Sequence, residues 1–579
     1  MKKTGAWLAR YALEQLPIQF TFGIPGVHNT ELYDELNSSE KIQPVLVTHE
    51  GCGAFMADAV SRVSDGIGCM LIVPAAGVTH AASGIGEAFL DGIPMLIISG
   101  GIRSDSKFGY QLHEMDQHKL LEPITKKTFK VESHDLVVPT IFEAYALAVD
   151  GEPGPVFVEI PVNIQLDRGD VPNLPEFLAA RHPYKLDEVS LEQAVTLLDG
   201  AKNPGIFVGW GALGAFDSIK AIAEHLGCPV ATTLQGVSAF PANHPLHAGF
   251  GFGNSAVPSA QNAFSQCDCL LAVGTRFGEI ATGSYGVNVP ENLIHIDINP
   301  QVFDRNFPAK VKLHGDSAEI CTKLFKKLQF SVAKRDSSEL QKKILGDKQA
   351  FREEWRKADK SAVVNPVRFF DELRMQLDDE AIVVVDDGNH TFLTAELMPV
   401  HRVGGMISPT DFNCMGYAVP ASIGAKLSNP KLPVVSIVGD GAFLMTAMEL
   451  ATASDNRVGT VQFVFNDGEL SQIAQAQTRP YNRTTCAKVA SVKLEGVAMA
   501  TGCDYVRIGN NEEIAASIAS ALEKAETGRS VIADVNIDYS KPTCFTLGAV
   551  KTNIKRLPFD TKVRMIGRAL YRKITLKSE

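Results

Sequence analysis

The chain has 579 residues, 45% of them apolar and 21% charged, with a formal net charge of −11; this size and composition predict a globular protein with several domains. The acidic balance argues against a nucleic-acid partner, and the sequence lacks the sustained apolar stretch that a signal peptide or a spanning helix needs. The ten cysteines are scattered without metal-ligand spacing, so we expect a cytoplasmic protein.

Strand-like and helix-like segments alternate over residues 1–170, which we interpret as a first α/β domain. This domain opens on an amphipathic helix and closes on a buried strand within Gly151–Pro161. Glu50 stands at a predicted helix start, and taken alone it is a surface glutamate. A lone histidine such as His28 or His113 is likewise more often structural than catalytic.

A second α/β domain is predicted over residues 186–330. It contains short apolar runs of the kind that form buried parallel strands: Gly205–Gly209, Leu270–Gly274 and Ile294–Ile298. The charged stretch Lys334–Lys360 then predicts a surface helix that leads into the last domain.

The third block, residues 360–540, completes a pattern that predicts three doubly wound α/β domains with parallel sheets. Asp440 follows the run VVSIVG, and Asp467 follows VQFVFN 27 positions later, which suits a strand-helix-strand unit. The two carboxylates would then lie at the carboxyl ends of neighbouring strands, where open α/β sheets bind ligands. Such oxygen ligands suit Mg²⁺, with a diphosphate completing the octahedron. On its own, a Gly-Asp-Gly sequence is more often a tight turn.

The C-terminal tail, residues 541–579, contrasts with the acidic whole. It holds ten Lys or Arg against two acidic residues, Asp560 and Glu579. Its apolar residues fall on one helical face: Val563, Ile566, Ala569, Leu570 and Ile574. The simplest interpretation is a terminal helix docked on the protein with its charges in water. The alternatives are a lid over the active site, or a surface for acidic phospholipid or a CoA phosphate.

Several segments form an ordered set of motifs over nearly the whole chain. Those in the first domain are Phe22–Gly26, Thr48–Glu50, Ala57–Arg62 and Val73–Ala81. Those in the third domain are Asp411–Ala421, Gly439–Gly441 and Asn466–Asp467. Together they resemble the thiamine diphosphate-dependent enzymes of the acetolactate synthase-like family, a group of 2-oxo acid decarboxylases and carboligases. The first set resembles the pyrimidine-binding domain of these enzymes and the second resembles their diphosphate-binding domain.

The resemblance implies how the reactive end of the cofactor is prepared. Glu50 would hydrogen-bond the pyrimidine ring in a desolvated site, so that a neighbouring amino group can act as a base. Met415, in the segment that also carries Asn413, would wedge under the cofactor and bend it. The bend is a proximity effect, because it brings the base close to the carbon that must lose a proton.

The resemblance also implies how the diphosphate is held. Asp440, Asp467 and the backbone carbonyl of Glu469 would bind Mg²⁺. Backbone N–H groups at two helix starts would donate to the phosphate oxygens. The residues concerned are Gly388, Asn389 and His390 at the first helix, and Gly439, Gly441 and Ala442 at the second.

Three polar residues are candidates for contact with the substrate. His28 lies where the family's benzaldehyde lyase has an active-site histidine, and His113 stands near a glutamine of related enzymes, so either would move protons at the substrate oxygen. Gln472, five positions after Asp467, would face the substrate by analogy. In this family the two half-sites meet across a subunit interface. We therefore expect a homodimer or homotetramer that acts on a small 2-oxo acid or acyl compound.

Several positions depart from the acetolactate synthases. Glu152, Val162 and Ile280 stand where those enzymes carry cations around FAD and the active-site entrance, and Asp467 replaces an asparagine. Losing these cations removes contacts to phosphate and carboxylate. The departures argue against an acetolactate synthase proper and against bound FAD, although Val273–Phe277 keeps the family pattern of the middle domain.

The expected function is thiamine diphosphate- and Mg²⁺-dependent carbon–carbon bond cleavage or formation. A 2-oxo acid would be decarboxylated and the product passed to a proton or a carbonyl acceptor. Alternatives within the class are an acetolactate synthase proper, a 2-hydroxyacyl-CoA lyase and an oxalyl-CoA decarboxylase-like enzyme, to which the string Glu114–Gln117 is similar. The alternative outside the class is a cofactor-binding homologue without turnover.

Overall fold

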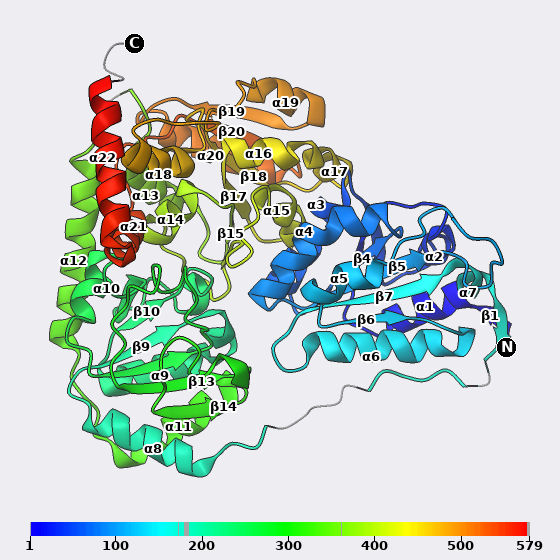
Figure 1. The fold of residues 1–579 in the computed structure, drawn as a ribbon, viewed down its shortest axis with the longest axis horizontal. Coiled ribbons are helices and arrows are strands. Elements are labelled where there is room, and N and C mark those ends of the chain that lie inside the picture. The colour runs from blue at the N-terminus through cyan, green and yellow to red at the C-terminus, as the bar shows by residue number, and fades with distance from the viewer. Residues whose placement is uncertain (1, 172, 179–183, 361, 576–579) are drawn as a thin grey trace.

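The computed structural model describes residues 2–171, 173–178, 184–360 and 362–575. It contains three α/β domains, each built on a six-stranded sheet in which every pair of neighbouring strands runs parallel (Figure 1). In Figure 1 the N-terminal domain lies on the right, the middle domain at lower left and the C-terminal domain above it. The prediction of three doubly wound parallel-sheet domains is confirmed.

The sheet of the N-terminal domain has the strand order β3-β2-β4-β5-β7-β6. Its central strands β4, β5 and β7 are buried along their whole length, as their apolar runs predict. The strands are β2 (Phe20–Gly23), β3 (Gln43–Leu46), β4 (Gly68–Ile72), β5 (Met95–Gly101), β6 (Lys127–Lys130) and β7 (Pro155–Pro161). The helices are α1 (Gly5–Glu14), α2 (Thr30–Leu36), α3 (Glu50–Val63), α4 (Ala76–Asp91), α5 (Gln117–Leu121), α6 (Val137–Val149) and α7 (Val162–Leu166). A short antiparallel pair, β1 (Lys2–Thr4) and β8 (Arg168–Asp170), ties the start of the domain to its end.

The middle domain has the order β11-β10-β9-β12-β13-β14, which reverses direction between β9 and β12. Its strands are β9 (Pro204–Val208), β10 (Val230–Thr232), β11 (His247–Phe250), β12 (Cys269–Val273), β13 (Asn292–Asp297) and β14 (Val311–His314). Its helices are α8 (Glu188–Gly200), α9 (Phe216–Leu226), α10 (Pro258–Ala263) and α11 (Ser317–Ser331). The charged stretch after this domain forms α12 (Ser338–Arg356), as predicted.

The C-terminal domain has the order β16-β15-β17-β18-β20-β19, which repeats the order of the N-terminal sheet. Its strands are β15 (Ile382–Val385), β16 (Met406–Ile407), β17 (Val434–Gly439), β18 (Val461–Phe465), β19 (Asp504–Ile508) and β20 (Val531–Val535). Its helices are α13 (Pro366–Gln376), α14 (Asn389–Leu397), α15 (Ala418–Ser428), α16 (Asp440–Thr446), α17 (Leu450–Asp455), α18 (Ser471–Tyr481), α19 (Leu494–Thr501) and α20 (Ile514–Glu526). The order reverses between β15 and β17, and open α/β sheets bind ligands at such a point.

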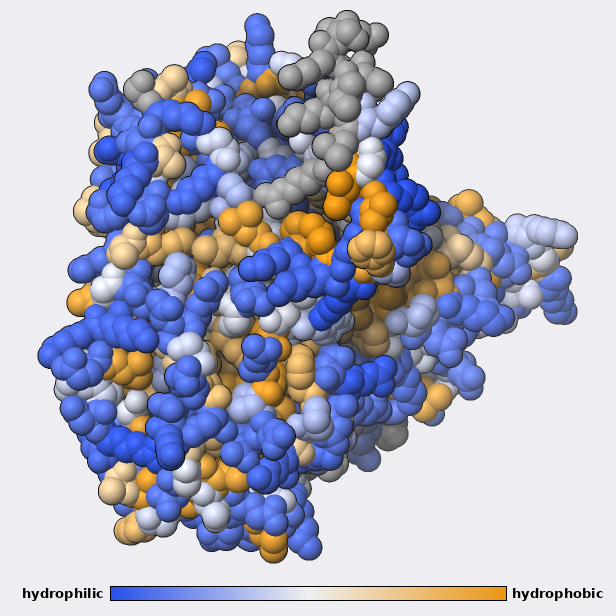
Figure 2. All heavy atoms as spheres, turned by 60° about the vertical axis from the view of Figure 1, so that its left-hand side comes forward, coloured by the Kyte–Doolittle hydropathy of each residue, from blue (hydrophilic) through white to orange (hydrophobic). Residues whose placement is uncertain are grey.

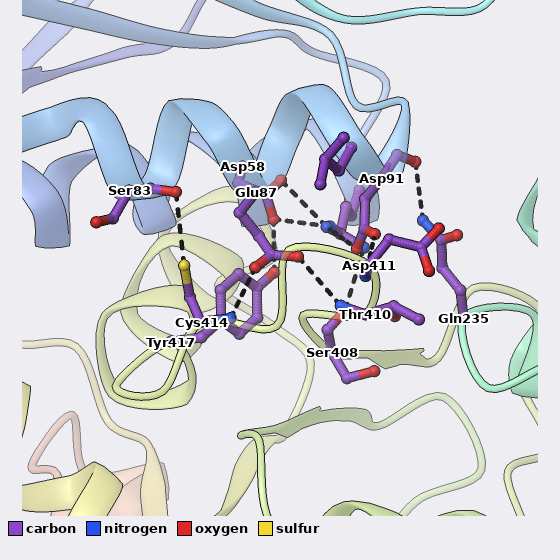
Figure 3. A network of polar contacts seen from close by, with 12 residues as sticks. Asp58, Ser83, Glu87, Asp91, Gln235, Ser408, Thr410, Asp411, Cys414 and Tyr417 are labelled. Carbon is purple, nitrogen blue, oxygen red and sulfur yellow. Dashed lines mark hydrogen bonds and ion pairs between the residues drawn. The ribbon is translucent and has the colours of Figure 1, made fainter. Parts of the chain in front are cut away.

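A buried polar network joins the N-terminal and C-terminal domains where α3 and α4 meet α15 and the loop before it (Figure 3). Arg62 in α3 contacts Asp58 at 2.7 Å and Asp91 at 2.9 Å, and all three side chains are 0% exposed. Tyr417, at the start of α15, donates its hydroxyl to Asp58 at 2.6 Å. One cation therefore balances carboxylates from two helices inside the domain interface.

The same network holds the loop that precedes α15. Glu87 accepts the backbone N–H groups of Thr410 at 3.1 Å and Cys414 at 2.9 Å, and Asp91 accepts that of Asp411 at 3.0 Å. Burial raises the pKa of Glu87 to about 8, and the charge of Asp91 adds to the shift. The N-terminal domain thus fixes the loop that carries Asn413 and Met415.

The C-terminal tail forms α21 (Cys544–Arg556) and α22 (Phe559–Thr575), and α22 packs against α18. No helix in the described ranges is long and apolar enough to cross a membrane. The docked face of α22 is cationic: Arg568 lies over the Tyr481 ring at 4.4 Å, and Arg572 donates to the Tyr481 carbonyl at 3.0 Å.

Three apolar residues of α22 are exposed. Phe559 is 81% exposed, Val563 52% and Ile566 60%, whereas Ala569 is half-buried. The side chains of Leu570 and Ile574 lie outside the described residues. Figure 2, which turns this side of the molecule forward, shows hydrophobic residues at the surface among hydrophilic ones. A docked helix is confirmed, and two of its half-buried cations, Arg568 and Arg572, take part in the contact with the body.

Candidate active site

A cavity of about 180 Å³ lies at the carboxyl ends of β15, β17 and β18, where the strand order reverses. We call it the β15–β17 cavity. It is lined by all of the cofactor and metal residues predicted in the C-terminal domain and by the substrate candidate Gln472. These are Gly388, Asn389, His390, Asn413, Met415, Gly439, Asp440, Gly441, Ala442, Asp467, Glu469 and Gln472. The fold therefore brings together residues from four separate stretches of sequence.

Asp440 is held at the floor of this cavity. It follows β17, is 7% exposed, and accepts the N–H of Gly441 at 2.7 Å and that of Gly468 at 2.8 Å. Burial raises its pKa to about 6, and the negative charge of Asp467 adds to the shift. Since β17 pairs with β18, the two carboxylates lie at the same edge of the sheet, as predicted.

Asp467 is fixed by its own turn. Its carboxylate accepts the N–H of Glu469 at 3.3 Å and the hydroxyl of Ser471. Burial raises its pKa, and the charge of Glu469 adds to the shift. In the described part of the chain no group of three or more His, Cys, Asp or Glu side chains suits a metal ion. A cation at this pair would therefore also need backbone and ligand oxygens, which agrees with the role predicted for the Glu469 carbonyl.

The His390 ring leaves no room for a side chain at two positions that line the cavity, Gly388 and Gly439. Its ring is buried and accepts the Gly439 N–H at Nε2 at 3.3 Å. Burial lowers its pKa to about 3, so the ring stays neutral. A Cβ at Gly388 would come within 2.6 Å of this ring and one at Gly439 within 2.9 Å, so neither position has room for a side chain. The ring supports both turns while the first N–H groups of α14, which have no partner within the helix, remain donors for an anion.

The loop that carries Asn413 and Met415 is held from two sides. Asp386, at the end of β15, accepts the N–H groups of Gly416 at 2.9 Å and Ala418 at 2.7 Å. Burial raises the pKa of Asp386 to about 7. Asn413 has a φ of +67°, a left-handed conformation that asparagine tolerates better than most residues. Together with Glu87 on the other side, these bonds fix where Met415 meets the cavity.

The residues predicted in the N-terminal domain form a second group. Glu50 begins α3 and is 5% exposed, in line with a desolvated carboxylate. The rings of His28 and His113 lie 5.0 Å apart, and the Nδ1 atom of each is buried without a hydrogen-bond partner. Burial lowers the pKa of His28, and His113 adds to the shift. The described residues that line the β15–β17 cavity all come from the C-terminal domain, so one chain does not bring the two groups into one cavity.

Comparison with known proteins assigns a family to this arrangement. The chain matches the N-terminal TPP binding domain of thiamine pyrophosphate enzymes over residues 2–120, their central domain over 191–324 and their C-terminal TPP binding domain over 386–535. It is 31% identical over 537 residues to the acetolactate synthase large subunit of Corynebacterium glutamicum, which covers 90% of this chain and 85% of that protein. The chain belongs to the thiamine pyrophosphate enzyme family.

Other relatives of this thiamine pyrophosphate enzyme carry similar names. The acetolactate synthase isozyme 3 large subunit of Escherichia coli is 28% identical, over 93% of this chain and 95% of its own. The probable acetolactate synthase large subunit of Methanocaldococcus jannaschii is 29% identical, over 82% and 81%. The predicted family and its cofactor, thiamine diphosphate, are thus confirmed, and the chain is a thiamine-dependent enzyme of the decarboxylase and carboligase class.

The residues present fit thiamine diphosphate. Two polar atoms of residues that line the β15–β17 cavity, the Tyr539 hydroxyl and the Gln472 Oε1, are buried without a hydrogen-bond partner. Burial raises the pKa of Tyr539, with the charges of Asp467 and Asp440 adding, so the hydroxyl keeps its proton and can donate to a phosphate oxygen. Tyr539 was missed in the sequence because it follows the last strand, β20, outside every motif.

A second cavity, of about 420 Å³, lies between the three domains, at the carboxyl ends of β9 and β12 of the middle domain. Its lining includes five carboxylates, Asp91, Glu152, Asp297, Asp316 and Asp411, of which Asp91 is paired with Arg62. Arg276 also lines it, but this guanidinium is already paired with Asp411 at 2.8 Å and with Glu152 at 3.5 Å. A lining of this charge does not suit the diphosphate of FAD, because like charges repel in a partly desolvated site.

We therefore predict that the purified protein carries no flavin. Absorbance at 450 nm should be absent, and added FAD should keep the fluorescence of the free molecule because it does not bind. The variant Glu152→Arg, which restores a cation at this cavity, serves as the comparison and should gain affinity for FAD. Stoichiometric flavin in the wild-type protein would contradict the prediction.

Proposed function

We propose that this protein decarboxylates a 2-oxo acid with thiamine diphosphate and Mg²⁺ and passes the product to a proton or a carbonyl acceptor. The observation that carries the proposal is the pair of carboxylates, Asp440 and Asp467, at one edge of a cavity in which the first N–H groups of α14 are donors for an anion. Decarboxylation followed by ligation makes the enzyme a transferase, whereas release to a proton makes it a lyase. The departures at Glu152, Val162 and Ile280 favour a branch distinct from acetolactate synthase proper.

Each residue has a defined task in this proposal. Asp440, Asp467 and the Glu469 carbonyl hold Mg²⁺, and the first turn of α14 binds the diphosphate. When bound, the cofactor would supply a nucleophilic carbon for the substrate carbonyl. Glu50 holds and releases the proton at the pyrimidine ring. The Tyr539 hydroxyl can donate to the bound ligands, and the Gln472 Oε1 can accept a hydrogen bond from them.

His28 and His113 move protons at the substrate oxygen. Their rings are close together, and each has a buried Nδ1 without a partner, which is a site for a substrate hydrogen bond. The lowered pKa of His28 favours its neutral form at physiological pH, and a neutral imidazole can accept a proton or donate one from its other nitrogen.

A product panel tests the proposed reaction. The purified protein with thiamine diphosphate and Mg²⁺ is mixed with single 2-oxo acids, acyl-CoAs and acyloins, with and without aldehyde acceptors, and products are read by mass. Carbon dioxide and a ligated product from a 2-oxo acid would support the proposal. Reaction of an acyl-CoA alone would instead indicate a 2-hydroxyacyl-CoA lyase or an oxalyl-CoA decarboxylase-like enzyme, and no product or adduct from any compound would indicate a homologue without turnover.

We propose that the smallest active unit is a homodimer, which exists alone or as half of a homotetramer. The reason is that Glu50 lies outside the cavity that holds Asp440. Mixing inactive Glu50→Gln and Asp440→Ala chains, after reversible dissociation, should then restore activity. Random pairing should give about one quarter of the wild-type activity. Half of the dimers then contain one chain of each variant, and each of these mixed dimers has one intact site out of two. Activity that stays at the level of the separate variants would contradict a shared site.

We further propose that α22 contacts an anionic lipid surface. Its exposed apolar stripe, Phe559, Val563 and Ile566, is flanked by the cations Lys562 and Arg564, a combination that suits acidic headgroups above acyl chains. The wild-type protein should sediment with vesicles that contain phosphatidylglycerol and remain free with phosphatidylcholine alone.

Matched variants test whether lipid binding depends on the exposed apolar residues of α22 rather than on exposed apolar residues elsewhere. Val563→Asp with Ile566→Asp should abolish sedimentation, whereas Phe330→Asp, at a residue that is 92% exposed on the middle domain, should not. A change in molar mass by light scattering without any lipid effect would show that the stripe meets another copy of the chain and would overturn the lipid proposal.

A further inference from the structure

The carboxylate of Glu50 has a titratable partner in the structure. His80, on α4, places its Nδ1 2.9 Å from Glu50 Oε2. The two residues come from helices that follow β3 and β4, and α3 packs against α4. The motif that contains His80 gave it no task, so the contact arises from the packing of the two helices.

This pair joins a buried group to an exposed one. The side chain of Glu50 is 6% exposed, whereas that of His80 is 50% exposed. The ring of His49 stacks on that of His80 with centroids 4.6 Å apart, and Nδ1 of His49 accepts the Gly51 N–H at 3.0 Å. A fixed neighbour thus holds the His80 ring between the carboxylate and solvent.

Tyr33, which also lies near Glu50, does not link the Glu50 carboxylate to solvent. Burial raises the pKa of Tyr33, with Glu50 among the lesser causes, and its hydroxyl donates to the Leu71 carbonyl at 2.9 Å. Tyr33 therefore keeps its proton at neutral pH. A Cβ at Gly77 would lie 3.3 Å from Glu50 Oε1, so this glycine limits the crowding around the second carboxylate oxygen. Oε1 is then available to the pyrimidine ring while Oε2 bonds His80.

We propose that His80 is a positioning residue that orients Glu50 and carries its proton to and from solvent. The proposal rests on the proposed function, in which Glu50 serves the pyrimidine ring. The transfer is balanced: the O–H bond at Oε2 breaks as an N–H bond forms at Nδ1, and the other ring nitrogen releases a proton to water. The reverse sequence reloads Glu50. No oxidant or further reactant takes part.

The test follows proton movement without needing a substrate. Thiamine diphosphate bound with Mg²⁺ is placed in D₂O, and exchange of the hydrogen on its thiazolium C2 is followed by quenched proton NMR. His80→Ala should slow this exchange about tenfold or more. Added imidazole should restore it, because a free imidazole can enter the space left by the ring. The affinity for thiamine diphosphate should stay within about threefold of wild type, since His80 acts through Glu50.

A matched control lies in the same domain. His118 pairs with Glu159 at 3.0 Å, and the side chain of Glu159 is also 6% exposed. His118→Ala should leave the exchange rate unchanged and show no response to imidazole. An unchanged rate in His80→Ala, or a loss that imidazole fails to restore, would overturn the proton transfer.

A last measurement separates this inference from the proposed reaction. In the protein without cofactor, the ring ¹⁵N signals of His80 should move when Glu50 is changed to Gln. Unmoved signals would overturn the contact itself, whatever the enzyme catalyses. Moved signals and slowed exchange, together with an empty product panel, would uphold the role of His80 and reject only the proposed substrate class.

Discussion

Replacing Glu50 with Gln is expected to lower the turnover number by about 10²- to 10⁴-fold, the range that general acid–base catalysis contributes. An amide keeps the size of the carboxyl group but cannot take up and release a proton at the pyrimidine ring. Glu50 is 5% exposed, so water does not readily replace it. The measurement is steady-state turnover at saturating thiamine diphosphate and Mg²⁺, together with the affinity for the cofactor.

The control for this variant is Glu159→Gln. Glu159 lies in the same domain and is also 5% exposed, but it bonds Gln117 at 2.7 Å and lies 3.3 Å from Lys130. We expect its turnover to match wild type even if its melting temperature falls. A Glu50→Gln variant with full turnover would reject the proton role of Glu50, and with it the role given to His80.

Replacing Arg62 with Met is expected to destabilise the protein by about 3–5 kcal/mol, because it leaves the carboxylates of Asp58 and Asp91 buried without their cation. The loss should appear as a lower melting temperature and as loosening of the loop before α15. Binding of thiamine diphosphate should weaken as well, since that loop carries Met415. Melting temperature and cofactor affinity are measured together.

Arg103→Met provides the comparison for Arg62. Arg103 also pairs with an aspartate, Asp105, at 2.7 Å, but both side chains are about half exposed. Exposed ion pairs contribute little to stability, so its melting temperature should remain close to that of wild type. Equal effects of the two variants would show that burial does not decide the contribution of Arg62.

The layout of the cavity could be predicted because it depends on local rules. Apolar runs predicted β17 and β18, and a carboxylate after each run must lie at the carboxyl edge of a parallel sheet. The sequence placed Gly388 and Gly439 at two helix starts beside the diphosphate. That both glycines pack against the His390 ring follows only from the structure.

The remaining features depend on packing between distant segments. The network around Arg62 joins α3, α4 and the loop before α15, which are far apart in sequence. Tyr539 reaches the cavity from a loop without a motif, and His80 reaches Glu50 because two helices meet. The helical periodicity of α22 predicted an apolar face but not its direction, because periodicity does not tell which face contacts the body.

The separation of Glu50 from the β15–β17 cavity has a consequence for the behaviour of the enzyme in dilute solution. If a site needs two chains, the concentration of sites follows a binding equilibrium between chains rather than the amount of protein. Specific activity should then fall when the protein is diluted, and it should recover after a lag when the diluted protein is concentrated again. A cofactor that contacts both chains would shift that equilibrium toward assembly, so thiamine diphosphate would act as a ligand that holds the subunits together as well as a reagent.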